Sequence, residues 1–293
     1  MRKIGIVTDS YSGITQEEAK KLGIAVLPMP FFCDDESVYE GVSITREQFF
    51  EKLNAGCKVA TSQGAPGEIM NLWRTELEKY EQILFIPLSS GLSGACQTAM
   101  MLAQEDEFDG KVFVVDNCRI SVPMYRSILD ALELIEEGFS AEEIKTILEK
   151  EKEKMSIYIA VETLEFLKKG GRISASSAAL GAALNIKPIL KCETDTLFAY
   201  KKTRGMKKAK KEMLEAMKHD MEVTFKEYSD RGDFFLMAAT TADEETTAAW
   251  VEEIKAYFPG MEVVSAPLTL GIACHTGERA LGIGCSCRPK REI

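Results

Sequence analysis

Histidine is scarce in this sequence: His219 and His275 are the only two among 293 residues. The eight cysteines contain no CxxC pair, and Cys274 with the nearby Cys285 and Cys287 matches no common zinc spacing. A metal site and a disulfide framework are therefore both disfavoured. We interpret the cysteines as reduced, mostly buried thiols.

Several motifs of nucleotide-binding proteins and hydrolases are also missing. There is no GxxxxGK[ST] and no GxGxxG that opens a strand-helix-strand unit, so no nucleotide cofactor is expected on this chain. Ser93 stands in SGLSGA, which does not match the GxSxG nucleophile elbow. His219 lies in a charged helical pattern typical of a solvated residue, whereas His275 precedes a glycine turn. A stand-alone hydrolase or phosphotransferase using Ser93 and His275 stays open as an alternative function.

Long hydrophobic runs are absent as well. No window approaches the length of a membrane span, and the apolar run at residues 4–7 is too short for a signal peptide. The net charge of −10 disfavours nucleic acid and anionic membrane surfaces as partners. We therefore expect a cytoplasmic protein with no integral membrane segment.

The first half of the chain alternates short apolar runs with helical patterns, which predicts a parallel sheet with helices on both faces. Helix caps are expected at Thr15 and Thr45, a capped, charged helix at 140–155, and Pro66 in a first helical turn. The predicted strands are 3–10, 24–32, 82–88 and 111–116, and the predicted helices are 15–23, 44–56, 65–80, 93–104, 123–138 and 140–155.

The second half has a different pattern of apolar runs, which predicts a mixed or antiparallel sheet with helices. Strands are expected at 156–163, 187–193, 196–203, 234–241, 261–269 and 270–277, with 187–203 forming a hairpin. The chain is thus expected to form two α/β domains, an N-terminal one at 1–155 and a C-terminal one at 156–293.

Hydroxyl and glycine residues gather in three loops of the first half: IVTDSYSG, VATSQGAPGE and IPLSSGLSG. Ligands of open parallel sheets bind outside the carboxyl ends of the strands. Glycine allows close backbone approach, and free amides at a helix start favour an anion. Serine and threonine are also ordinary helix caps, so one such loop is weak evidence, but three together favour an anion site.

The segment VETLEFLKKGGRIS and the Ala-rich residues after it are unusual. Arg172, in a tight basic turn, offers a planar fork to a carboxylate or phosphate. Residues 175–184 indicate either close helix packing or a narrow apolar passage beside the anion site. The basic run from Lys201 to Lys218 indicates either a solvated helix face or a docking surface for an acidic partner or phosphate.

Taken together, these segments resemble the DegV family of bacterial fatty-acid-binding proteins. The matching pieces occur in the family's order and cover almost the whole chain: IGIVTDSYSGI, TSQGAPGE, IPLSSGLSGACQTA, VETLEFLKKGGRIS, NIKPIL, KKTRGMKKA and GIACHTGERALG. Two positions depart from the family's usual pattern. Gly64-Ala65 replaces Pro-Ser or Pro-Thr, and Glu278-Arg279 replaces Pro-Gly.

The resemblance implies a lipid-binding protein, not an enzyme, with one long-chain fatty acid such as palmitate held between two α/β domains. It implies that Thr61 and Ser93 bind the carboxylate and that Arg172 and His275 are the family's conserved arginine and histidine. Some members present the carboxylate to a separate ATP-binding fatty-acid kinase subunit, which forms an acyl phosphate, and Arg204 is the residue expected to dock that partner. The ligand-binding residues expected in full are Thr61, Ser62, Ser93, Gly94, Arg172, His275 and Thr276.

Overall fold

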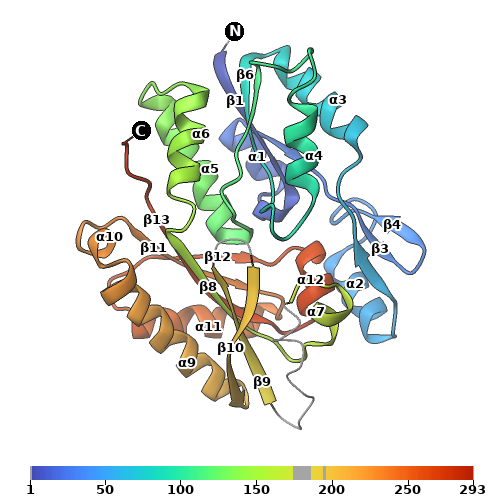
Figure 1. The fold of residues 1–293 in the computed structure, drawn as a ribbon. Coiled ribbons are helices and arrows are strands. Elements are labelled where there is room, and N and C mark those ends of the chain that lie inside the picture. The colour runs from blue at the N-terminus through green and yellow to red at the C-terminus, as the bar shows by residue number, and fades with distance from the viewer. Residues whose placement is uncertain (1, 174–185, 194–195, 293) are drawn as a thin grey trace. The chain divides into compact units, whose positions relative to one another are not determined.

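The computed structural model describes residues 2–173, 186–193 and 196–292. The chain divides into two compact units, residues 1–153 with 289–293, and residues 154–288. Each unit combines a β-sheet with helices (Figure 1), so the predicted pair of α/β domains is confirmed. Within the described residues, none of the helices has both the length and the apolar character that a membrane crossing needs.

The first unit is built on a parallel sheet with the strand order β2-β1-β6-β7. Its strands are β1 (Arg2–Asp9), β2 (Ala25–Leu27), β6 (Tyr80–Ile86) and β7 (Val112–Val114). Its helices are the 3-10 helix η1 (Ser10–Ser12), α1 (Gln16–Leu22), α2 (Arg46–Asn54), α3 (Pro66–Leu77), α4 (Ala95–Leu102), α5 (Ser121–Glu136) and α6 (Ala141–Lys150).

Both faces of this parallel sheet are covered by helices, as predicted. Leu84 and Ile86 point into a core that they share with residues of α1, α5 and α6. Phe85, on the opposite face, packs edge to face against Trp73 of α3 with 5.5 Å between ring centroids. Figure 1 shows α5 and α6 on one side of the sheet and α3 and α4 on the other. The alternation follows from the two-residue period of a strand.

The predicted caps of the first unit are confirmed. The hydroxyls of Thr15, Thr45 and Ser140 each accept a hydrogen bond from the backbone N–H three residues later, at the starts of α1, α2 and α6. Pro66 is the first residue of α3, where its missing N–H costs no hydrogen bond. Local side-chain chemistry therefore determined these helix starts.

One predicted strand of the first unit was wrong. The apolar run at 24–32 is not continuous, because β2 ends at Leu27 and a separate strand, β3 (Phe31–Cys33), begins after Pro28 and Pro30. Proline lacks the N–H that a ladder needs. Strand β3 belongs to a small antiparallel sheet with β4 (Glu36–Val38) and β5 (Val59–Thr61), in the order β4-β3-β5.

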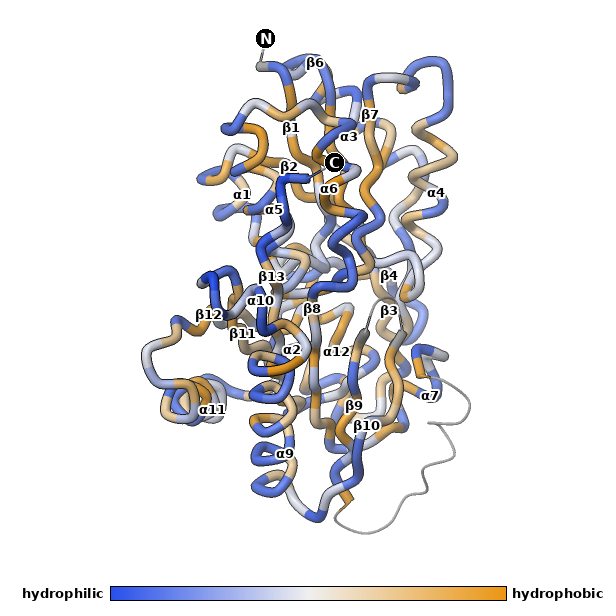
Figure 2. The backbone as a smooth tube through the Cα atoms, turned by 60° about the vertical axis from the view of Figure 1, so that its left-hand side comes forward, coloured by the Kyte–Doolittle hydropathy of each residue, from blue (hydrophilic) through white to orange (hydrophobic). Residues whose placement is uncertain are grey.

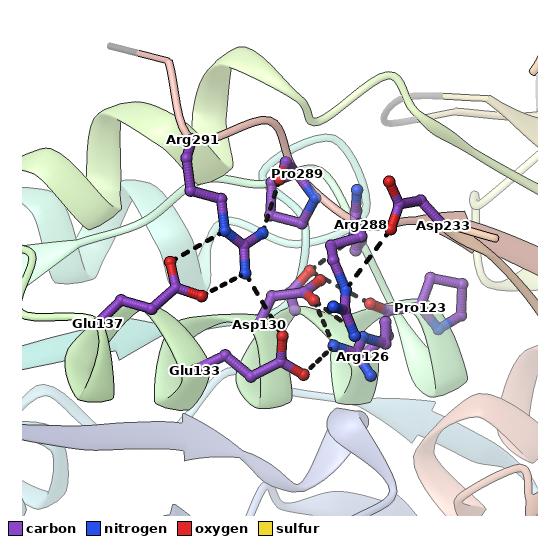
Figure 3. A network of polar contacts seen from close by, with 11 residues as sticks. Pro123, Arg126, Asp130, Glu133, Glu137, Asp233, Arg288, Pro289 and Arg291 are labelled. Atoms are coloured by element: carbon purple, nitrogen blue, oxygen red, sulfur yellow. Dashed lines mark hydrogen bonds and ion pairs between the residues drawn. The ribbon is translucent and has the colours of Figure 1, made fainter. Parts of the chain in front are cut away.

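The last residues of the chain return to the first unit and are held against α5 by ion pairs (Figure 3). The Arg291 guanidinium contacts the carboxylates of Glu137 at 2.9 Å and Glu133 at 3.5 Å. Arg126 of the same helix joins this network through Asp130 at 2.6 Å and Glu133 at 2.6 Å. Because Arg126 is nearly buried with Asp130, this inner pair is better shielded from water than the Arg291 pairs.

The second unit contains a mixed six-stranded sheet in the order β10-β9-β8-β13-β11-β12. Its strands are β8 (Met155–Ala160), β9 (Ile186–Glu193), β10 (Thr196–Arg204), β11 (Phe234–Thr240), β12 (Val263–Pro267) and β13 (Leu281–Cys287). Its helices are α7 (Glu165–Lys169), α9 (Met206–His219), the π-helix η2 (Asp220–Thr224), α10 (Lys226–Asp230), α11 (Glu244–Tyr257) and α12 (Leu270–Thr276).

The predicted mixed sheet and hairpin of the second unit are confirmed. β9 and β10 pair in antiparallel fashion, and β11 and β12 are the parallel neighbours. Helices α9 and α11 contribute Met213, Met217 and Trp250 to the core over this sheet. The polar face of α9 is turned to solvent, and Figure 2 shows its hydrophilic stretches broken by apolar residues.

Residues 270–277, predicted as a strand, form helix α12 instead. The run Leu-Gly-Ile-Ala-Cys is buried throughout and shows no alternation, so its periodicity did not distinguish a strand from a short buried helix. The strand is the following segment β13, which pairs with β8 and β11. Gly282 in β13 leaves room for the Ala239 carbonyl, which would lie 2.9 Å from an added Cβ. The first glycine of GIGCSC thus serves close strand packing.

Candidate functional site

The TSQ loop of the first unit follows β5 directly. Thr61 is the last residue of that strand and pairs with Phe31 of β3, so its position is set by the small sheet. Ser62 is half-buried, and its hydroxyl donates a hydrogen bond to the Gln63 carbonyl at 3.2 Å. The Gln63 side-chain oxygen accepts a hydrogen bond from the Thr98 hydroxyl of α4 at 3.2 Å. This bond links the TSQ loop to α4, the helix that follows the SSGLSG loop.

The SSGLSG loop, residues 87–94, connects β6 to α4. Ser93 donates its backbone N–H to the Ser89 carbonyl at 3.1 Å, and its hydroxyl accepts from the Ala95 N–H at 3.2 Å. Gly94 is exposed, and an added Cβ there would lie 3.7 Å from the Gln63 side-chain oxygen. The structure therefore places the loop that carries Thr61 and Ser62 beside the loop that carries Ser93 and Gly94, with Gln63 at the contact.

Two aspartates behind the 87–94 loop, the buried Asp9 and the half-buried Asp116, were not identified from the sequence. The Asp9 carboxylate accepts a hydrogen bond from the Leu88 N–H at 2.7 Å, and the Asp116 carboxylate accepts one from the Ser90 N–H at 3.3 Å. Burial raises the pKa of Asp9 to about 7, and the backbone amides of Leu88 and Tyr11 partly offset that rise. An aspartate at the end of a predicted strand was the available signal.

In the second unit, Arg172 and His275 lie at the junction of α7 and α12. An added Cβ at Gly170 would lie 2.1 Å from His275 Nδ1, so the imidazole packs directly on this glycine. The Arg172 guanidinium donates a hydrogen bond to the Gly170 carbonyl at 2.5 Å. Arg172 and His275 thus both contact Gly170. His275 lies in the last turn of helix α12 and not at the end of a strand, as had been predicted.

Burial, together with the nearby positive charge of Arg172, lowers the pKa of His275 to about 4. The imidazole is therefore neutral at neutral pH. A histidine with so low a pKa is a weak general base, which disfavours the alternative of a hydrolase that relies on His275. A neutral imidazole can still donate or accept a hydrogen bond with a carboxylate or phosphate oxygen.

The turn after α12 is held by a hydroxyl that sequence reasoning missed. The buried Thr241 hydroxyl donates to the Gly277 carbonyl at 2.8 Å and accepts from the Ala280 N–H at 2.8 Å. Thr276 is also buried, and its hydroxyl lies 3.3 Å from the Ile272 carbonyl within its own helix. Thr276 thus bonds to backbone in this structure, and its predicted contact with a ligand stays a prediction.

The lysines and the arginine of the basic run are mostly exposed, which agrees with both of its interpretations. Lys201 pairs with Glu212, and Lys210 pairs with Glu253 at 2.7 Å. Arg204, the last residue of β10, is exposed. His219 at the end of α9 is exposed too, as expected for a solvated histidine.

Three other expectations concern the acyl tail, a metal ion and the cysteines. The Ala-rich segment 175–184, the expected wall of an acyl passage, lies outside the described residues. Across the parts of the chain that are described, no three His, Cys, Asp or Glu side chains cluster in a way that could hold a metal ion. No disulfide joins the cysteines, all eight of which are described, and seven of their side chains are buried.

Comparison with known proteins decides the family. The sequence model described as "Uncharacterised protein, DegV family" matches residues 3–287. The chain belongs to the DegV family. A DegV domain-containing protein of Deinococcus radiodurans is 31% identical over 281 residues, which cover 96% of this chain and 97% of that protein.

Solved structures of other DegV proteins share this fold over nearly the full length. A fatty-acid-binding DegV family protein from Thermus thermophilus superposes with a TM-score of 0.87 at 34% identity, and the match covers 98% of this chain and 100% of that one. DegV of Bacillus subtilis, described as a fatty acid binding protein, gives a TM-score of 0.83 at 28% identity, with 98% and 100% covered. The predicted family and fold are confirmed.

Proposed function

We propose that this DegV-family chain binds a long-chain fatty acid and presents its carboxylate to an ATP-binding kinase subunit, which converts it to an acyl phosphate. The full-length similarity to the fatty-acid-binding protein of Thermus thermophilus carries the first part of this proposal. The kinase step rests on the resemblance of the sequence motifs to members that serve such a kinase.

The loops of the first unit suit a carboxylate. Thr61, Ser62 and Ser93 carry hydroxyl groups, of which that of Ser62 must exchange its bond to the Gln63 carbonyl for the ligand, and the bond between Gln63 and Thr98 holds the two loops together. A carboxylate that leaves water needs several donors to replace its lost hydration. We assign Thr61, Ser62, Ser93 and Gly94 to this role, and we assign Arg172, His275 and Thr276 of the second unit to ligand binding as well.

The acyl tail supplies most of the affinity in this proposal. Burial of about sixteen carbons contributes about 12 kcal/mol at about 0.8 kcal/mol per CH₂ group. Association costs of about 4–15 kcal/mol offset much of that gain. The head group therefore orients the ligand and adds a smaller increment, which makes a partial loss of affinity the expected result of head-group mutations.

Removal of the head-group hydroxyls tests the binding step. Thr61→Ala and Ser93→Ala should each weaken palmitate binding about 10- to 150-fold, since a hydrogen bond to a charged group contributes about 1.5–3 kcal/mol. Ser37→Ala is the matched control, because Ser37 is an exposed serine on β4 of the same unit. Titration calorimetry measures both. Unchanged affinity in the Thr61→Ala/Ser93→Ala double variant would remove the head-group assignment.

The kinase step needs a second measurement, acyl-phosphate formation with a kinase subunit from the same cell. His275→Ala should keep palmitate bound but slow phosphorylation, because a neutral imidazole can stabilise charge on the forming acyl phosphate. Arg204→Ala should raise the concentration of kinase subunit needed, whereas Lys211→Ala, which removes an exposed α9 lysine paired with Glu215 at 3.6 Å, should not. An unchanged rate of acyl-phosphate formation with the His275→Ala protein would contradict the proposed role of His275 in presenting the carboxylate to the kinase subunit.

A further inference from the structure

A buried carboxylate at the end of β1 binds the backbone of the loop that carries Ser93. Asp9 is 1% exposed, and its two carboxylate oxygens accept separate backbone hydrogen bonds. One oxygen accepts from the Leu88 N–H at 2.7 Å and the other from the Tyr11 N–H at 2.9 Å. Leu88 opens the loop that carries Ser93, so the carboxylate anchors that loop where it leaves β6.

The next residue, Ser10, is linked to the TSQ loop through the backbone between β2 and β3. Its hydroxyl accepts a hydrogen bond from the Met29 N–H at 3.0 Å. Met29 lies between β2 and β3, and the following Pro30 carbonyl accepts a hydrogen bond from the Ser62 N–H at 3.4 Å. Adjacent side chains at the end of one strand thus reach the backbone behind both head-group loops.

The arrangement around Asp9 favours an ionised carboxyl. Each oxygen accepts a hydrogen bond from a backbone N–H, and protonation turns one oxygen into a hydroxyl, which is a weaker acceptor than a carboxylate oxygen and so weakens one of the two bonds. Burial works against ionisation and brings the pKa of Asp9 to about 7. The two states of the anchor therefore exchange near neutral pH.

We propose that Asp9 is a positioning residue for the fatty-acid head group: in its ionised form it fixes the Leu88–Ser93 loop in its binding conformation, and Ser10 supports the TSQ loop. This inference rests on the proposed function, because it takes Thr61 and Ser93 as the carboxylate ligands. Asp9 acts through the backbone and touches no ligand itself. Palmitate affinity should therefore fall as Asp9 is protonated.

Other titratable groups lie on the elements that surround the end of β1. They are Tyr11 on η1, Asp116, Cys118 and Arg119 after β7, and Tyr125, Arg126 and Asp130 on α5. Arg119 is engaged with the Ser127 hydroxyl at 2.8 Å and the Glu151 carbonyl at 3.2 Å. The pKa shift of Asp9 has burial as its largest cause, followed by the Leu88 and Tyr11 amides.

The pH dependence of palmitate binding between pH 6 and pH 8 tests the inference. With a pKa of about 7, the ionised fraction of Asp9 rises from about 0.1 to about 0.9 across this range, so affinity should tighten up to about ninefold. A free carboxyl titrates near pH 4, and the pKa of His275 is lowered to about 4, so neither group changes charge in this range. Asp9→Asn should bind more weakly at pH 8 and show no such dependence, whereas Asp35→Asn, an exposed control, should match the parent.

A second measurement needs neither ligand nor variant. Amide hydrogen-exchange protection of residues 88–93 in the unmodified chain, corrected for intrinsic exchange, should fall from pH 8 to pH 6. If palmitate does not bind the parent protein at all, the proposed function is overturned and this inference with it. If palmitate binds but affinity and protection are both independent of pH in this range, or if Asp9→Asn keeps the parent's pH profile, the inference alone is overturned.

Discussion

Gly170→Ala probes the contact on which the position of His275 depends. Gly170 has φ −77° and ψ −10°, a backbone conformation that alanine adopts without strain. The new Cβ, however, would lie 2.1 Å from His275 Nδ1 and 2.6 Å from Cε1. Carbon and nitrogen atoms do not approach so closely, so the imidazole must leave its place or α7 and α12 must separate.

Two opposing effects set the change in the free energy of unfolding caused by Gly170→Ala. Overpacking of this kind costs about 1–3 kcal/mol, and the reduced entropy of the unfolded chain returns about 0.4–1 kcal/mol. We expect a net loss of about 1–2 kcal/mol in the free energy of unfolding, measured by urea titration with circular dichroism. The pKa of His275 should also rise from about 4 toward 6.5 as the ring gains water, which NMR titration of its ring protons would show.

Two variants separate the steric clash from a general effect of alanine. Gly67→Ala is the control, since Gly67 lies in α3 and an added Cβ there meets no atom within 4 Å. It should stabilise the protein by about 0.5–1 kcal/mol. Removing the imidazole in Gly170→Ala/His275→Ala should recover most of the loss. The reasoning is refuted if Gly170→Ala behaves like Gly67→Ala, or if the double variant shows no coupling between the two sites.

Two further predictions concern the turn after α12. Thr241→Val should lower the free energy of unfolding by about 2–4 kcal/mol, because the buried Gly277 carbonyl and Ala280 N–H each lose a partner. Thr241→Ser keeps the hydroxyl and should recover most of the lost stability. Equal stability of the Val and Ser variants would contradict this role of the hydroxyl. Arg279→Gly should raise stability by about 0.5–1 kcal/mol, since Arg279 has φ 59°, a left-handed conformation that glycine adopts more readily. Glu278→Gly is the control and should lower the midpoint of thermal unfolding. A lower midpoint for Arg279→Gly as well would contradict the prediction and show that Arg279 makes compensating contacts.

Elements with strong local signals were predictable. The helices that begin at Thr15, Thr45 and Ser140 have side chains that bond to their own first-turn amides, which requires no information from the rest of the chain. The hairpin of β9 and β10 and the covered parallel sheet were likewise visible in the alternation of apolar runs and turns. The ordered set of motifs was enough to indicate the family.

Segments without a clear period were not predictable in the same way. The apolar pattern of residues 24–32 did not show that this run divides between two sheets, and the pattern of residues 270–277 did not show that this run is helical. Their conformation depends on what covers them, since a segment buried on every side shows no polar face in its sequence. The prolines of the first run were a usable warning of the break.

The sequence by itself determined that Ser, Thr and Gly would gather at the ends of strands, because the residue types in TSQ and SSGLSG are read directly. Only the tertiary structure decided which buried groups hold those loops. Asp9 reaches Leu88, 79 positions away, and Thr241 reaches Ala280, 39 positions away. It also decided that His275 packs on Gly170 and has a low pKa. Such contacts join residues far apart in the chain, and their energies depend on burial, which no local pattern specifies.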